Sequence, residues 1–146
     1  PALAVANNPH CAAEAEIMGL NSADFTVFGL PNFADQTSEH NGGGIYHRSG
    51  TLTLSNTLVI GNSATWTYSD GSMGSSTGGG INSAYGTTTL IDTTITGNFA
   101  GSGGGGLKVT YDANPGSAGP TVLTLVNTTI SGNSAPSGYE QNCLGC

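Results

Sequence analysis

Residues 42–64 read GGGIYHRSGTLTLSNTLVIGNSA, and the chain repeats this stretch twice more. The second copy, at 78–100, reads GGGINSAYGTTTLIDTTITGNFA and has the same 23 residues without a gap. The third copy begins with GGGL at Gly104 and closes with TLVNTTISGNSA at Ala135, and an insertion around 112–119 lengthens it to 32 residues. Repetition of a fixed unit is typical of solenoids, so this stretch decides the fold.

Alignment of the copies shows which positions keep one chemistry. Three columns stay apolar, namely Ile45/Ile81/Leu107, Leu54/Leu90/Leu125 and Val59/Ile95/Ile130, and Leu52/Thr88/Leu123 is less strict. Polar columns are also kept, namely Asn62/Asn98/Asn133, each after a glycine, and Thr57/Thr93/Thr128. These columns indicate positions that a repeated backbone requires.

The TLTL segment at 51–54 alternates with the period of two that is typical of a strand with one buried face. We expect three short strands in each copy: after GGG, across TLTL and across LVIG. A unit of 23 residues cannot bury its own apolar face, whereas copies stacked about 4.8 Å apart can do so. The sequence therefore predicts an all-β parallel β-helix, with interior ladders such as Val59, Ile95 and Ile130.

The asparagine column has a distinct expected role. Stacked Asn62, Asn98 and Asn133 would form a ladder of side-chain amides at one corner, each donating to and accepting from its neighbours. The preceding glycines supply the positive φ of the corner.

The motifs of the copies resemble those of a known group of proteins. The GGG-I segments at 42–45, 78–81 and 104–107 and the I-x-G-N segments at 59–62, 95–98 and 130–133 look like right-handed β-helix repeats of the pectate-lyase-like superfamily. They are also similar to the GGAI and FxxN repeats of bacterial polymorphic outer-membrane and autotransporter passenger proteins, with an aliphatic residue in place of the usual Phe. The resemblance covers about 42–135 and implies a right-handed solenoid.

The 146 residues fit a single β-solenoid domain. We divide it into an N-terminal strand and capping helix at 1–20, a degenerate coil at 21–41, three full coils at 42–135 and a cysteine-containing tail at 136–146. The helix is expected within 7–20, because Asn8 can cap it and Gly19 can end it. In the degenerate coil, the letters Asn-Phe-Ala at 32–34 echo those at 98–100.

The composition excludes some classes of partner. Two basic and nine acidic residues give a net charge of −7, so we expect no nucleic-acid binding, which requires clustered Lys and Arg. No apolar run approaches the roughly 20 residues of a membrane helix, so we expect no membrane insertion.

A secreted or cell-surface location is expected from the Thr/Ser/Asn/Gly-rich, Lys-poor composition and from cysteines near both ends. PALAVA at 1–6 ends in the A-x-A form of a signal-peptide stub, or it is an ordinary mature N-terminus. Cys11, Cys143 and Cys146 are disulfide candidates. Their odd number suggests a bond between chains, with a free buried cysteine as the alternative.

Two insertions, at 65–77 and 109–119, carry the candidate recognition residues. Trp66, Tyr68 and Tyr111 would form a sugar-stacking or subunit-contact patch, unless each ring simply covers the base of its own loop.

Catalytic and metal-binding groups are sparse. Asp70, Asp92 and Asp112 fall in different coils, so we expect no active site. His40 and His47 together with Glu39 are the alternative of a metal site, but we expect both histidine side chains to face solvent and no cofactor to bind.

The sequence thus favours a non-enzymatic extracellular structural protein that stacks end to end with copies of itself into a filament, sheath or surface layer, with or without disulfides between chains. The alternative is a surface adhesin or carbohydrate-binding passenger whose partner is a glycan. A polysaccharide lyase or hydrolase is the minority reading.

Overall fold

A computed structural model of the chain describes residues 25–27, 32–34, 37–38, 41–47, 50–110, 121–136 and 143–144. Every regular element in these ranges is a β-strand, and the strands form four sheets. The all-β prediction is therefore confirmed for the described residues. The predicted capping helix at 7–20 lies outside them, as do Cys11, His40, Tyr111, Asp112 and Cys146.

Each sheet takes one strand from each successive segment of the chain. The first sheet contains β1 (Phe25–Val27), β5 (Thr51–Ser55), β9 (Thr87–Ile91) and β13 (Val122–Val126) in that order. The second contains β2 (Asn32–Ala34), β6 (Leu58–Ile60), β10 (Thr94–Thr96) and β14 (Thr129–Ser131). The third contains β3 (Thr37–Ser38), β7 (Ser63–Ala64) and β11 (Phe99–Ala100), and the fourth contains β4 (Ile45–His47), β8 (Ile81–Ser83), β12 (Leu107–Val109) and β15 (Cys143–Leu144).

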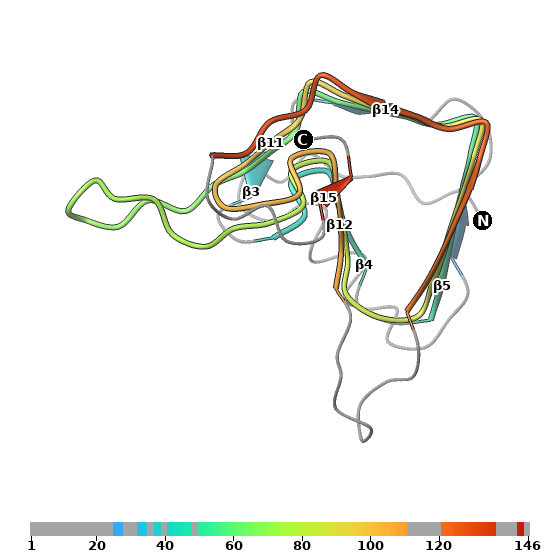
Figure 1. Cartoon of the computed structure of the whole chain (residues 1–146), viewed down its shortest axis with the longest axis horizontal. Helices are drawn as coiled ribbons and strands as arrows, with labels where there is room; N and C mark the ends of the chain where they lie inside the picture. The colour runs from blue at the N-terminus through green and yellow to red at the C-terminus, as the bar shows by residue number, and fades with distance from the viewer. Residues whose placement is uncertain are drawn as a thin grey trace.

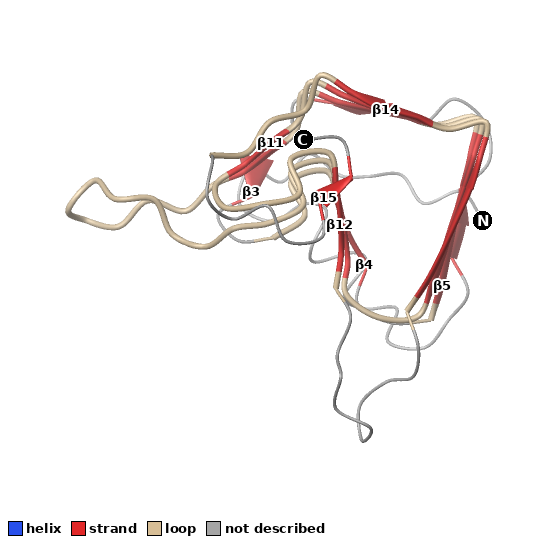
Figure 2. Ribbon diagram, viewed as in Figure 1, coloured by secondary structure: helices blue, strands red, loops and turns tan. Residues whose placement is uncertain are grey.

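The strands stack in parallel, as in a β-solenoid. All neighbours within the sheets pair in parallel except β12 and β15, which are antiparallel. In Figure 1 the strands of each sheet overlie one another, and three of the sheets form the sides of a roughly triangular outline. Figure 2 shows the strands as these straight sides, joined by loops at the corners.

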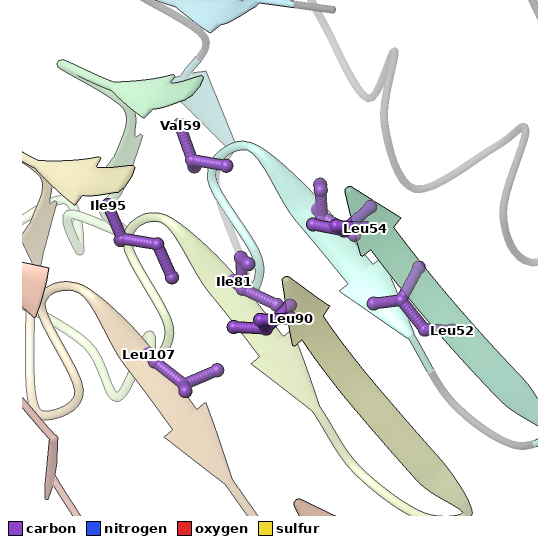
Figure 3. Close-up of a cluster of buried hydrophobic side chains, with 8 residues drawn as sticks. Leu52, Leu54, Val59, Ile81, Leu90, Ile95 and Leu107 are labelled. Atoms are coloured by element: carbon purple, nitrogen blue, oxygen red, sulfur yellow. The ribbon is translucent and has the colours of Figure 1, made fainter. Parts of the chain in front are cut away.

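The register of the sheets is the one that the repeat alignment predicts. Ile45 pairs with Ile81 and Ile81 with Leu107, while the Leu54/Leu90/Leu125 and Val59/Ile95/Ile130 columns align in the same way. Side chains of these columns form the buried core in the first two copies and at Leu107, and Ile130 packs against them (Figure 3). Burial of apolar area at roughly 25 cal/mol per Å² is the main force that holds the copies together.

Two expectations about the strands were incomplete or wrong. Each of the first two copies contains a fourth strand, β7 or β11, which is too short at two residues to show alternation in the sequence. The echo between 32–34 and 98–100 was misleading, because β2 pairs with Leu58–Ile60. This register places Phe33 at the level of Val59, so the apolar column, rather than the shared letters, sets the pairing.

Left-handed residues turn the chain at its corners. Gly61, Gly97 and Gly132 have φ of 67°, 65° and 63°, as the sequence predicted. A second corner uses Asn56, Asp92 and Asn127, with φ of 50°, 48° and 47°. Asn and Asp tolerate this conformation better than other residues that carry a Cβ, which explains why only these two types fill the column.

Candidate functional site

The amide ladder of the corner is fully engaged in holding the copies together. Asn62 Nδ2 donates to Asn98 Oδ1 at 2.9 Å, and Asn98 Nδ2 donates to Asn133 Oδ1 at the same distance. The backbone amides of Asn62 and Asn98 donate to the same two oxygens at 2.9 and 3.0 Å. All three side chains are buried, so the ladder presents no group to a ligand.

The exposed carboxylates also have local partners. Asp92 lies in the left-handed column, where the side-chain amide of Asn127 donates a hydrogen bond to it. Asp70 Oδ1 accepts from the Ser72 hydroxyl at 2.6 Å and from the Ser72 backbone amide at 2.9 Å. These hydrogen bonds hold the pKa of Asp70 below its usual value. Asp70 and Asp92 therefore stabilise turns of the backbone, and among the described residues neither belongs to a group of three or more possible metal ligands.

His47 faces the interior, so the expectation that it faces solvent was wrong. It is 3% exposed, because it lies two residues after Ile45 along β4, so both side chains point to the same inward face. Its Nδ1 atom lies 3.2 Å from Ser83 Oγ, which shares a hydrogen bond of 2.7 Å with Thr88 Oγ1. A histidine beside a serine is also the arrangement in which a general base activates a nucleophile. Ser83 and Thr88 are completely buried, however, so their hydroxyl groups are not accessible to a substrate.

The described residues offer no group of three or more His, Cys, Asp and Glu side chains that could hold a metal ion. In the same residues no helix is long and apolar enough to cross a membrane. Of the three cysteines, the structure describes the backbone of Cys143, which lies in β15 opposite Lys108.

The insertion at 65–77 forms a projecting hairpin, drawn as the long green loop in Figure 1. An antiparallel bridge joins Thr67 to Met73, and Gly74 packs against the Trp66 side chain, where a Cβ would lie only 3.3 Å away. The rings of Trp66 and Tyr68 are 5.1 Å apart between centroids, and the two residues are 40% and 49% exposed. The structure thus brings together two of the three predicted recognition residues.

A pocket of about 250 Å³ lies apart from these aromatic residues. Tyr46 and Asn82, which line it, pair across β4 and β8. The remaining lining residues are Asn41, Thr77, Ala84, Tyr85 and Thr110. Sequence reasoning missed this pocket, although Tyr46 and Tyr85 could have suggested it as tyrosines that follow the first and second GGG motifs.

Three of the lining residues form a directed chain of hydrogen bonds. Asn82 Nδ2 donates to the carbonyl and hydroxyl oxygens of Thr77 at 3.3 and 2.9 Å. The Thr77 hydroxyl in turn donates to Asn41 Oδ1 at 3.0 Å. Because the Thr77 carbonyl can only accept, the amide orientation of Asn82 is fixed. Within the described part of the chain, the buried Asn82 Oδ1 has no hydrogen-bond partner.

The third copy forms an open end of the stack. Leu125 is 41% exposed, whereas Leu54 and Leu90 in the same column are fully buried. Val122 and Val126 at the two ends of β13 are exposed as well. Among the described strands, none pairs with the outer edge of β13 or β14.

No family model matches the chain, and no curated protein or solved structure matches it either. Function is therefore inferred below from the chemistry of these surfaces.

Proposed function

We propose that the protein is a non-enzymatic structural protein whose solenoid stacks end to end with copies of itself into a filament, sheath or surface layer. The observation that carries the proposal is the exposure of Leu125, an interior column residue that a further strand layer would bury. A partner strand on β13 would cover this residue in the same way that β9 covers Leu54.

The chemistry of the open edge favours pairing. Natural edge strands usually carry Lys, Pro or a bulge that prevents association. The sequences of β13 and β14, VLTLV and TIS, contain neither a charged residue nor a proline. In contrast, β12 carries Lys108 and is already paired with β15. Addition of a strand to an exposed edge is a common mode of recognition, and here it would use β13 and β14 together.

The order of the strands supports a head-to-tail arrangement. In the first sheet β1 and β13 occupy opposite ends, and in the second sheet β2 and β14 do so. If β1 and β2 of one molecule stacked on β13 and β14 of the next, they would repeat the parallel pairing that joins β1 to β5 and β2 to β6. Stacking of this kind requires that an N-terminal capping helix leave the outer edges of β1 and β2 on assembly. A contact between two different surfaces that does not close into a ring generates an open fibre.

At finer detail we propose a right-handed β-helix with about three full coils, a degenerate first coil and an N-terminal capping helix. The resemblance to pectate-lyase-like and passenger-protein repeats supports this description. The strong general preference for right-handed connections between parallel strands, about 98% of cases, supports the handedness. Secretion or display at the cell surface agrees with the same resemblance and with the cysteine content.

Light scattering and electron microscopy of the 146-residue chain, with and without reductant, test the proposal. We expect mass to increase with concentration and fibres to form. Val126→Lys should block assembly, because it places a charge on the open edge strand, whereas Ser55→Lys, at the equivalent column position in β5, should assemble normally. A monomer at every concentration, or equal assembly of the two variants, would contradict end-to-end stacking.

A further inference from the structure

The pocket beside β4 and β8 has the composition of a site for a hydroxylated ligand. Tyr46 and Tyr85 contribute two half-buried aromatic rings, and Ala84 adds an apolar surface. Asn41, Asn82, Thr77 and Thr110 contribute amide and hydroxyl groups. Ligand pockets combine apolar or aromatic walls with a few fixed polar groups in this way.

The electrostatics of the lining select among hydroxylated ligands. None of the seven lining residues is charged, so neither a phosphate nor a carboxylate would find a counter-ion among them. The whole chain carries a net charge of −7, which further disfavours anions. A neutral polyol or sugar satisfies amides and hydroxyls without needing a counter-charge.

The polar wall is pre-organised and incomplete at one atom. The hydrogen bonds from Asn82 to Thr77 and from Thr77 to Asn41 fix three side chains of the pocket in one orientation. They leave the buried Asn82 Oδ1 acceptor without a partner among the residues that the structure describes. A buried unpaired acceptor is unfavourable. A ligand hydroxyl that donated to Asn82 Oδ1 after a small shift of the neighbouring side chains would remove this cost and increase the affinity.

We propose that this pocket binds one neutral pyranose ring of a saccharide. The volume of about 250 Å³ is below the roughly 300–1,000 Å³ of pockets for drug-sized ligands, so it suits a single ring better than a chain. A pyranose has an apolar face that stacks on tyrosine and hydroxyls that reach amide groups. The site is separate from the exposed Trp66 and Tyr68 of the hairpin, which do not line it.

The pocket is also distinct from the surface of proposed self-association. Its residues belong to segments around β4 and β8 and, at Thr110, to the end of β12, whereas the open end is formed by β13 and β14. Sugar binding and assembly are therefore independent properties, and loss of one in a variant need not affect the other.

Nuclear magnetic resonance titration tests the proposal, with the methyl β-pyranosides of glucose, galactose and N-acetylglucosamine as probes and glucuronic acid as the acidic comparison. We expect saturable shifts of the Asn82 side-chain amide with at least one neutral probe and weaker binding of the acid. Tyr85→Ala should weaken affinity about tenfold through loss of stacking, and Trp66→Ala should leave it unchanged.

Tyr46→Phe and Tyr85→Phe keep the aromatic rings and should not disturb the fold. The amide spectrum of each variant verifies that it is folded. Each should retain shifts on titration, with affinity lowered only where a hydroxyl contacts the sugar. No saturable shift with any neutral probe, preferential binding of glucuronic acid, or loss of binding in Trp66→Ala rather than Tyr85→Ala would overturn the proposal.

Discussion

Asn62 and Asn98, which are 36 residues apart, are joined by two hydrogen bonds of 2.9 Å to one oxygen atom. The Asn98 Oδ1 atom accepts from both the backbone amide and the side-chain amide of Asn62. Asn98 repeats the relationship with Asn133, so one residue type at one corner connects successive copies. An alternative acceptor of the same length, such as aspartate, would lack the donor that continues the ladder.

Replacement of Asn98, the middle member of this ladder, should therefore lower the free energy of unfolding more than replacement of Asn133 at its end. Asn98→Ala removes the acceptor of two Asn62 hydrogen bonds and the side-chain donor to Asn133 Oδ1, which keeps the backbone amide of residue 98, and each buried group left unsatisfied costs about 1–3 kcal/mol. We expect the free energy of unfolding, measured with urea, to fall by about 3 kcal/mol or more. Asn133→Ala, at the end of the ladder, should cost less. Equal effects of the two variants would argue against a continuous ladder.

Substitution of a glycine that faces this ladder should also lower the stability of the protein. A Cβ on Gly80 would lie 2.5 Å from the Gly106 carbonyl oxygen and 3.0 Å from Asn98 Nδ2, so Gly80→Ala forces neighbouring copies apart. Gly97→Ala is the matched control, because its Cβ meets nothing closer than 3.8 Å and its cost is the left-handed backbone, about 1–2 kcal/mol. Thermal unfolding should show the larger loss for Gly80→Ala. A larger loss for Gly97→Ala would mean that backbone conformation, not stacking, requires the glycines.

The parallel stacking and its register followed from the sequence because equivalent residues of a solenoid lie over one another. An apolar column such as Val59, Ile95 and Ile130 reports directly on spatial neighbours. The degenerate segment continues the apolar columns, since Phe25 pairs with Leu52 and Phe33 with Val59, but the letters at 32–34 indicated the wrong register. The strand Ser63–Ala64 was missed because two residues cannot display a period.

The pocket was beyond sequence reasoning for a different reason. Its lining combines residues from three segments, and Thr77 and Asn82 become neighbours of Asn41 only through stacking. His47 was misassigned because its polarity was weighed above its position, two residues after the inward-facing Ile45. Alternation along β4 was the signal that could have placed it.

The turn of the projecting hairpin should respond to acid. The hydrogen bonds from Ser72 lower the pKa of Asp70 below its usual value, so the ionised carboxylate stabilises the turn at neutral pH. This contribution is present above the unfolded pKa and is lost as pH falls through the folded one. A pH titration of the Ser72 amide signal should show a midpoint below about 3.8, the ordinary value for Asp. Asp70→Asn should abolish the transition, and a midpoint above the ordinary value would contradict the assigned hydrogen bonds.

Substitutions in the buried polar trio of His47, Ser83 and Thr88 should have strongly non-additive effects on the free energy of unfolding. Ser83→Ala removes the hydroxyl that contacts both other residues and leaves the longer contact of 3.4 Å between His47 Nδ1 and Thr88 Oγ1, so we expect the free energy of unfolding to fall by about 1–3 kcal/mol. The triple variant His47→Leu/Ser83→Ala/Thr88→Val removes every member, so its loss should be smaller than the sum of the three single losses. Apolar residues are compatible with these positions, because Thr88 pairs with Leu52 and Ser83 pairs with Val109. Urea unfolding of all four variants measures the coupling, and simple additivity would mean that the three side chains do not act as one network.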